Sequence, residues 1–206
     1  MNLEHISVSN AAGTIKTMKD VEEACRPNAM TAIMVGSITL KPRQGNKPDR
    51  GAGRVYYYDV NGGWSLNSLG LPNEGFVEYM RLLPEMARRA HAAGKELHAS
   101  IAGETAEEYA NMAYECYKLG VDKVELNFGC PNVWGTNGKQ KPIPSYTPTI
   151  ARRVLLTVRD KLQSGRTVDI KISPVEDSYT LQQLAEMCNN IKCVSNVVGT
   201  NTIPNQ

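Results

Sequence analysis

Val124-Glu-Leu-Asn-Phe-Gly-Cys-Pro-Asn-Val-Trp-Gly135 is the stretch that decides the fold and marks the candidate site. An apolar-alternating run ends in Asn127, and a proline-containing turn with Cys130 and Asn132 follows. A strand with this ending delivers two amides and one thiol to one place. Amides can orient a planar polar ligand, and a thiol can move a proton. A second loop rich in asparagine and glycine, residues 66–73, is predicted to complete such a pocket.

Length and composition allow one sizeable hydrophobic core. The chain has 206 residues, of which 41% are hydrophobic, in keeping with domains of roughly 100–200 residues. The formal net charge of +2 comes from cations scattered among acids, which does not argue for nucleic-acid binding. No apolar run approaches the ~20 residues of a membrane span, and the N-terminus shows no secretory leader.

Cysteine usage indicates a reducing, cytoplasmic environment. The five cysteines are odd in number and include no Cys-x-x-Cys pair, so zinc and dithiol chemistry are weakly supported. Reduced thiols fit a cytosolic protein best. None of the three histidines has the spacing of a metal ligand, and we predict no metal site.

Apolar runs alternate with segments of helical periodicity along the chain. Strands are predicted at residues 6–9, 31–36, 96–101, 123–127, 168–173 and 196–202, and helices at residues 17–25, 76–93, 105–119, 149–162 and 179–191. Pro84 is expected to kink or break the second helix. A long loop or hairpin insertion is predicted at residues 40–66, with the tyrosines near residue 57 packing on the body.

Polar residues distinguish two folds that share this alternation, a doubly wound sheet and a (β/α)8 barrel. They follow almost every predicted strand: Asn10, Ser37, Asn127, Ser173 and Asn201. A barrel builds its site from all strand ends, whereas an open sheet concentrates its site at one switch point. We therefore predict an α/β fold of the (β/α)8 TIM-barrel type. Because a barrel needs eight strands and only about six are visible, we expect one domain over residues 1–206 that is incomplete at its C-terminus.

Four motifs occur in order along the chain: Asn67–Asn73, Ser100–Gly103, Leu126–Val133 and Ile170–Pro174. Together they resemble dihydroorotate dehydrogenase, the flavin enzyme that oxidises dihydroorotate to orotate in pyrimidine synthesis. The likeness covers nearly all of this chain but about two thirds of a family member. It implies FMN as the cofactor and dihydroorotate as the substrate.

The resemblance also implies a class within the family. Soluble members carry a cysteine base in the loop after the fourth strand, as Cys130 does here, and membrane-associated members carry serine. The segment Pro142–Tyr146 resembles the loop of the fumarate-linked enzymes. Fumarate is therefore the expected electron acceptor, an NAD-linked partner subunit is the alternative, and a homodimer is expected because soluble members usually form one.

Residue roles follow from the same resemblance. Cys130 would take the proton while the hydride goes to N5 of FMN, and a free thiol titrates at about 8.5, close enough to neutral for this task. Lys16 is expected to replace, near the flavin, a lysine that soluble members carry at the position of Gly36. The expected substrate-binding residues are Asn67, Ser68, Leu69, Gly70, Leu71, Asn127, Asn132, Asn201 and Thr202. The expected cofactor-binding residues are Ala11, Ala12, Gly13, Gly36, Ser37, Asn127, Lys171 and Asn201.

The chain departs from the family pattern at three places. Gly36 stands where soluble members have lysine, and Gly129 stands where the motif has serine. The last two strands, whose glycine-rich loops hold the flavin phosphate in the family, are absent. Two alternatives to a catalytic chain of this kind remain. One is a non-catalytic truncated or degenerate barrel fragment that needs a partner chain, and the other is a related flavin reductase acting on pyrimidine bases, against which Asn132 argues.

Overall fold

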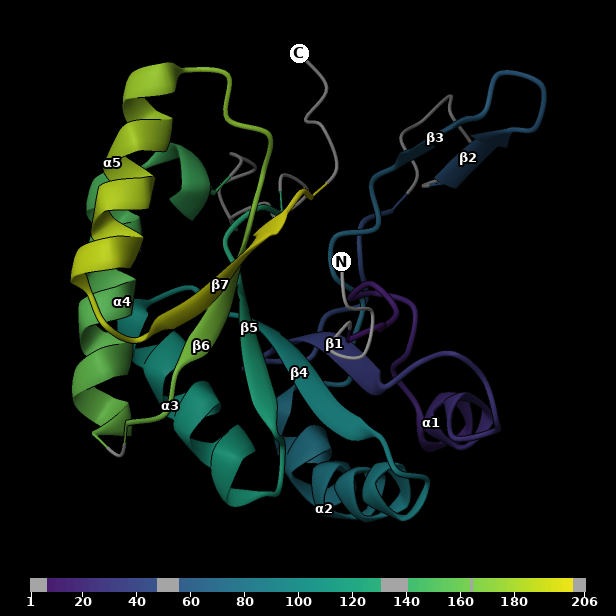
Figure 1. The fold of residues 1–206 in the computed structure, drawn as a ribbon. Helices are drawn as coiled ribbons and strands as arrows, with labels where there is room; N and C mark the ends of the chain where they lie inside the picture. The colour runs from purple at the N-terminus through teal and green to yellow at the C-terminus, as the bar shows by residue number, and fades with distance from the viewer. Residues whose placement is uncertain (1–6, 48–55, 131–140, 164, 202–206) are drawn as a thin grey trace, which may run out of the picture.

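A computed structural model describes residues 7–47, 56–130, 141–163 and 165–201 (Figure 1). Its centre is a parallel sheet of five strands. In spatial order these are β1 (Ala32–Thr39), β4 (Glu96–Ala102), β5 (Lys123–Asn127), β6 (Val168–Ile172) and β7 (Val194–Gly199). The spatial order follows the sequence order, without the reversal that creates the switch point of a doubly wound sheet.

Helices form a single layer along the outer side of this curved sheet (Figure 1). They are α1 (Met18–Ala24), α2 (Phe76–Ala92), α3 (Ala106–Lys118), α4 (Pro148–Leu162) and α5 (Ser178–Asn190), and a 3-10 turn, η2 (Pro144–Tyr146), precedes α4. Each helix contacts the next one in the chain. One layer of helices around sequentially ordered parallel strands is barrel architecture, so the predicted TIM-barrel type of fold is confirmed, as an open portion of a barrel.

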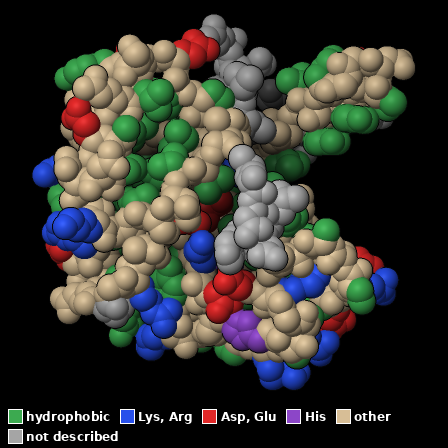
Figure 2. Space-filling view, viewed as in Figure 1, with side chains coloured by type: hydrophobic (Ala, Val, Ile, Leu, Met, Phe, Trp, Pro, Cys, Tyr) green, Lys and Arg blue, Asp and Glu red, His purple; other side chains and the backbone are tan. Residues whose placement is uncertain are grey.

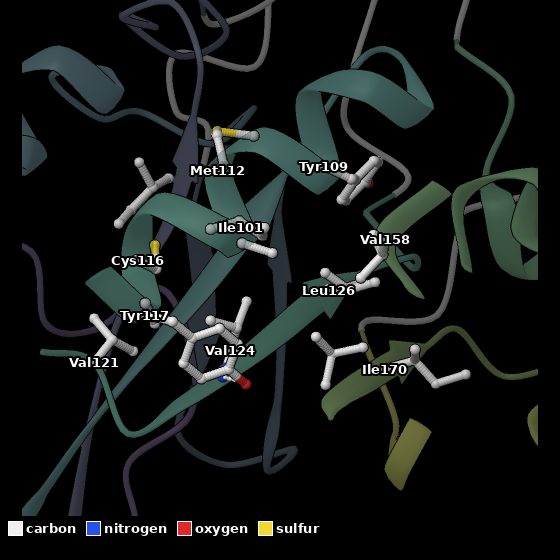
Figure 3. Packing of buried hydrophobic residues seen from close by; sticks show 14 of the residues in the cluster. Ile101, Tyr109, Met112, Cys116, Tyr117, Val121, Val124, Leu126, Val158 and Ile170 are labelled. Atoms are coloured by element: carbon white, nitrogen blue, oxygen red, sulfur yellow. Dashed lines mark hydrogen bonds between the residues drawn. The ribbon is translucent and has the colours of Figure 1, made fainter. Parts of the chain in front are cut away.

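Alternation along the strands separates an apolar outer face from a polar inner face. Val124 and Leu126 of β5 are fully buried in the main hydrophobic cluster. Figure 3 shows both within the group of side chains that includes Met112 of α3 and Ile170 of β6. Because successive side chains on a strand point to opposite faces, Glu125 and Asn127, which alternate with Val124 and Leu126, face the barrel interior. Both of these positions carry polar side chains.

The first predicted strand, at residues 6–9, is not formed as a strand in the part of the chain that the structure describes. Ser9 makes an isolated parallel bridge to Ala32. The next residue replaces strand pairing with its side chain: Asn10 Nδ2 donates to Met34 O at 2.7 Å, and Asn10 Oδ1 accepts from Met34 N at 2.8 Å. A side-chain amide that satisfies the backbone in this way competes with regular pairing.

The expectation that Pro84 breaks the second helix is wrong, because α2 runs through it. Pro84 lies on the exposed face of the helix, where water can satisfy the carbonyl that proline leaves without its helical partner. On the other face Tyr79, Leu83 and Met86 are each at most 1% exposed. Packing of this apolar stripe outweighs the lost hydrogen bond.

Residues 56–67 form an antiparallel hairpin of β2 (Tyr56–Asp59) and β3 (Trp64–Asn67). The hairpin projects from the body, and Figure 2 shows apolar side chains along it. Tyr57 is 47% exposed and stacks on Trp64 within the hairpin, so the expectation that the tyrosines pack on the body is wrong.

None of the helices in the described residues is long and apolar enough to cross a bilayer.

Candidate active site

The turn that leads into Cys130 is held by three hydroxyl groups from three elements. Tyr109, Ser145 and Ser173 donate in turn to the carbonyl oxygens of residues 127, 128 and 129, at 2.9, 3.0 and 2.8 Å. All three donors are buried. Because three consecutive carbonyls are held from outside, the path of the backbone into the half-buried Cys130 is fixed.

Gly129 occupies a position in this turn that leaves no room for a side chain. A Cβ atom there would lie 2.7 Å from Ser173 N and 2.9 Å from Asn201 Cβ. These distances are shorter than van der Waals contact, and neither atom is the end of a flexible side chain. The serine expected at residue 129 from the resemblance would therefore clash with backbone atoms where three strand ends approach each other.

Two predicted carboxamides meet at this point. Asn201 Nδ2 donates to Asn127 Oδ1 at 3.0 Å, and Asn127 Nδ2 donates to Ser37 Oγ at 2.9 Å. Ser37 lies in turn 2.9 Å from the hydroxyl of Ser100. The chain of contacts joins residues near the carboxyl ends of β1, β4 and β5 to Asn201, just beyond β7, so groups far apart in the sequence share one polar layer.

Asn127 and Cys130 line one cavity of about 730 Å³, within the usual size range of small-molecule sites. Leu71 of the Asn-rich loop lines it as well. Its rim carries charges of both signs, and Lys141 pairs there with Glu104. This ion pair holds the pKa of the Glu104 carboxyl below its usual value. Cys130 and Asn127 thus line the same cavity.

In the loop of residues 67–73, four consecutive backbone carbonyl groups accept hydrogen bonds from other segments or from within the loop. The carbonyl oxygens of residues 69, 70, 71 and 72 accept from Asn46 N, Arg43 Nε, Asn73 Nδ2 and Lys16 Nζ, at 3.0, 3.0, 2.8 and 2.8 Å. In a trans peptide the N–H points opposite to the C=O. The N–H groups of Gly70 and Leu71 are therefore directed away from Asn46 and Arg43.

Lys16 joins the first loop to this Asn-rich loop through its bond to Pro72 O. Burial lowers the pKa of its ammonium group, and the nearby carboxylate of Asp20 opposes that effect. Lys16 is absent from the residues found to line the cavity with Cys130. The structure therefore places Lys16 beside the predicted substrate loop, and not in the cavity that Cys130 lines.

The predicted cofactor loop, residues 11–13, lies against the bend in β1. Gly13 N donates to Gly36 O, and Gly36 N donates to Ile15 O at 3.1 Å. Ala11 is exposed and Ala12 is half-buried. Gly36 has a φ of +110°, and a Cβ there would lie 2.3 Å from Ser100 O. A lysine at residue 36 is thus sterically excluded on this backbone.

Lys171 lies beside Asn127 in the register of β5 and β6, and is half-buried. Its charge lowers the pKa of Glu125, although burial dominates and raises that pKa overall. Sequence reasoning missed Glu125, which is 3% exposed on the inner face. The sequence pattern could have revealed Glu125, because it lies two residues before Asn127 and therefore on the same side of β5.

Several predicted residues are placed elsewhere. Asn67 ends β3 and is half-buried, and it is absent from the residues found to line the cavity. Ser68 accepts from Asn46 Nδ2 at 3.3 Å, and Leu69 is 38% exposed. Asn132 and Thr202 lie outside the described residues.

An open (β/α) barrel with a polar site at the carboxyl ends of its strands is the class that fold and site define. A sequence model of the family described as "Dihydroorotate dehydrogenase" matches residues 4–206. The chain therefore belongs to the dihydroorotate dehydrogenase family.

Individual relatives agree with this assignment. The chain is 36% identical over 126 residues to the catalytic subunit of dihydroorotate dehydrogenase B (NAD(+)) of Thermoanaerobacter sp. (strain X514). The matched region covers 61% of this chain and 38% of that subunit. It is 28% identical over 209 residues to the dihydroorotate dehydrogenase (fumarate) of Trypanosoma cruzi (strain CL Brener), covering 98% and 61%. The chain thus spans less than two thirds of the length of these curated relatives.

A crystal structure of Old Yellow Enzyme from Pichia sp. AKU4542 matches with a TM-score of 0.48 and 11% identity, over 82% of this chain and 55% of that one.

Proposed function

We propose that this chain forms the catalytic part of an FMN-dependent dihydroorotate dehydrogenase, which oxidises dihydroorotate to orotate in de novo pyrimidine biosynthesis. The observation that carries the proposal is that Cys130 and Asn127 line one cavity, with Asn201 bonded to Asn127. Membership of the family and the activities for which the relatives are named support it.

The donor set of the inner face fits a flavin. An isoalloxazine edge alternates C=O and N–H groups, and the amides of Asn127 and Asn201 can donate and accept together. Gly36 lets the backbone approach closely because it has no Cβ, and the loop of residues 11–13 lies against it. When bound, FMN supplies the chemistry that amino acids lack, since it accepts a hydride at N5. Lys171 would stabilise negative charge on the flavin ring.

Proton removal falls to Cys130 in this proposal. Dihydroorotate loses a proton from one carbon and a hydride from its neighbour, so the thiolate form of Cys130 takes the proton and becomes a thiol. The three hydroxyls that hold residues 127–129 keep the thiol in place for this transfer. Lys16 is proposed as the lysine that balances charge from the first loop.

Recognition of the substrate carboxylate is assigned to the Asn-rich loop. The N–H groups of Gly70 and Leu71 are directed away from Asn46 and Arg43, and are therefore proposed to bind the carboxylate, since loop N–H groups bind anions. Asn67, Ser68, Leu69 and Asn132 are proposed to complete the pocket around the ring.

The wider biochemistry follows the relatives. Fumarate is the proposed electron acceptor, with an NAD-linked subunit as the alternative, because relatives named for each kind of acceptor match this chain. We propose a cytoplasmic homodimer and a single barrel domain over residues 1–206 that further strands would complete. The alternative, a non-catalytic fragment that needs a partner chain, is favoured by one observation: the outermost strand β7 is largely exposed, with Val197 51% exposed.

The test begins with the purified chain and added FMN. A bound-flavin absorbance spectrum that bleaches on anaerobic addition of dihydroorotate supports the enzyme, and a colourless chain supports the non-catalytic alternative. Cys130→Ser should slow this bleaching by orders of magnitude at neutral pH, because serine is far harder to ionise. Cys188→Ser, on the remote helix α5, is the matched control. Equal bleaching rates in wild type and Cys130→Ser would remove the thiol from the mechanism.

A further inference from the structure

Leu71, in the middle of the Asn-rich loop, has a left-handed backbone conformation. Its φ is +57°, and that of Gly70 before it is +71°. Glycine adopts such angles freely, whereas leucine is strained by them. The other non-glycine residue with a positive φ among the described residues, Gln163, ends helix α4, where this conformation is common. Strained residues of this kind persist only where their surroundings hold them, so Leu71 must be held by its neighbours.

The turn at Gly70 and Leu71 cannot close itself. Two successive residues with positive φ are typical of a type I′ turn, in which the N–H of the following residue often bonds to the carbonyl of the preceding one. The following residue here is Pro72, which has no N–H. The carbonyl of the preceding residue, Leu69, accepts from Asn46 N at 3.0 Å instead. The conformation of the turn therefore depends on groups outside it.

The side chain of Asn73, which is 7% exposed, supplies one of these groups. Its Oδ1 accepts from Thr39 N at 3.2 Å and from Gly75 N at 2.9 Å. Because backbone N–H groups only donate, the atom that they share is the oxygen, and the other atom is the amide nitrogen. This nitrogen donates to Leu71 O at 2.8 Å and to the Thr39 hydroxyl at 2.9 Å. The Thr39 hydroxyl itself donates to Lys41 O at 2.7 Å, so it is an acceptor for Asn73.

The peptide planes on both sides of Leu71 are thus held. The carbonyl of Gly70 accepts from Arg43 Nε at 3.0 Å, and the carbonyl of Leu71 accepts from Asn73 Nδ2. The φ and ψ of Leu71 set the angle between these two planes, so fixing both planes fixes its conformation. The two donors belong to segments that are joined, because Arg43 N donates to Asn73 O at 2.8 Å and Asn73 N donates to Arg43 O at 2.9 Å.

We propose that Asn73 is a positioning residue, which holds Leu71 in its left-handed conformation through the hydrogen bond to Leu71 O and so keeps the Leu71 N–H directed at the substrate carboxylate. The proposal rests on the proposed function in that this N–H binds the carboxylate. Asn73 is absent from the residues found to line the cavity with Cys130, whereas Leu71 is among them. Asn73 therefore acts through Leu71. Without its amide nitrogen, Leu71 can relax to a negative φ, which turns its N–H.

The first experiment measures the conformation of Leu71 by NMR in the full chain without added ligand. A positive φ brings the amide proton close to the α proton of the same residue, so the NOE between them should be strong in the wild type. Asn73→Asp keeps the oxygen that accepts two backbone N–H groups and removes the donor to Leu71 O. It should weaken this NOE to the level of residues with negative φ. Asn28→Asp is the matched control, because its Nδ2 donates to a remote carbonyl, Ala24 O at 3.2 Å, and it should leave the NOE strong.

A second substitution separates the hold on Leu71 from a general effect on the fold. Glycine adopts the left-handed conformation unaided, so Leu71→Gly should reduce the effect of Asn73→Asp. In the flavin-loaded wild-type background, Asn73→Asp should raise the KM for dihydroorotate about tenfold, the factor expected for one hydrogen bond, with a smaller effect on kcat. In the Leu71→Gly background the rise should be less than about threefold. The charge that Asn73→Asp adds acts equally in both backgrounds, so it cannot produce this difference.

A strong Leu71 NOE in Asn73→Asp, or an equal rise in KM in both backgrounds, would overturn the proposal. If Asn73→Asp alone does not fold, a cooperative unfolding transition regained in the Leu71→Gly background supports the proposal, and a double variant that is also unfolded contradicts it. A wild-type chain that binds no flavin would refute the proposed function, while the NOE would still decide whether Asn73 holds Leu71.

Discussion

Restoring the family serine at residue 129 should destabilise this protein, although it brings the sequence nearer to its relatives. On the present backbone a Cβ at residue 129 would lie 2.7 Å from Ser173 N, 2.9 Å from Asn201 Cβ and 2.9 Å from the carbonyl carbon of Ile172. Two of these three atoms belong to the backbone, so no side-chain rotation relieves the contact. Overpacking of a buried site typically costs about 1–3 kcal/mol, and fixed neighbours place Gly129→Ser at the upper end, at about 3 kcal/mol.

Equilibrium unfolding in urea measures this cost. With a slope of about 2 kcal/mol per molar urea, the unfolding midpoint of Gly129→Ser should fall by about 1.5 M. Gly199→Ser is the matched control, because a Cβ at residue 199 meets nothing within 4 Å, and its midpoint should stay within about 0.25 M of the wild type. A Gly129→Ser midpoint equal to that of the wild type would refute the steric argument and with it the proposed reason for the departure.

Three further predictions concern a buried lysine, a buried tyrosine and a helix-capping aspartate. Lys95→Met should lower the unfolding free energy by about 2 kcal/mol in urea titrations, because the buried ammonium donates to three acceptors near the end of α1; an unchanged midpoint would contradict this role. Tyr109→Phe should cost about 1–2 kcal/mol and raise the KM for dihydroorotate, since it leaves the buried carbonyl of Asn127 without its donor; unchanged stability would show that another donor replaces it. The pKa of Asp20 is lowered by two backbone N–H groups at the start of α1. Its ionised form therefore stabilises the fold above the unfolded pKa of about 3.9, and the contribution is lost as pH falls through the lower folded value. Thermal unfolding between pH 5 and 2 should show a steeper loss for wild type than for Asp20→Asn, and parallel curves would contradict the assignment.

Local patterns in the sequence predicted the elements whose formation depends on local periodicity. The alternation that ends at Asn127 predicted β5 with its bounds, and polar residues after successive strands predicted barrel order. The strand expected at residues 6–9 and the break expected at Pro84 did not form, because tertiary packing decided both. The amide of Asn10 took the place of strand pairing, and a buried helix face carried the proline on its solvent side.

Contacts between distant segments could not be predicted in the same way. Tyr109 and Ser145 read as an ordinary helix residue and a loop residue, and only the folded chain shows their hydroxyls on the carbonyls that precede Cys130. Glu125 differs, because the period of two already placed it beside Asn127. An acidic residue on the inner side of a barrel strand is a signal that sequence reading can use.

The two glycines that depart from the family pattern have one physical origin. Gly36 and Gly129 both lie where strand ends approach so closely that a Cβ would meet backbone atoms, Ser100 O in one case and Ser173 N in the other. Lys16 lies at the end of the loop bonded to Gly36, and the hydroxyl of Ser173 donates to Gly129 O. A side chain restored at either glycine would therefore meet backbone atoms of a neighbouring segment, and neither position can take one unless that segment moves.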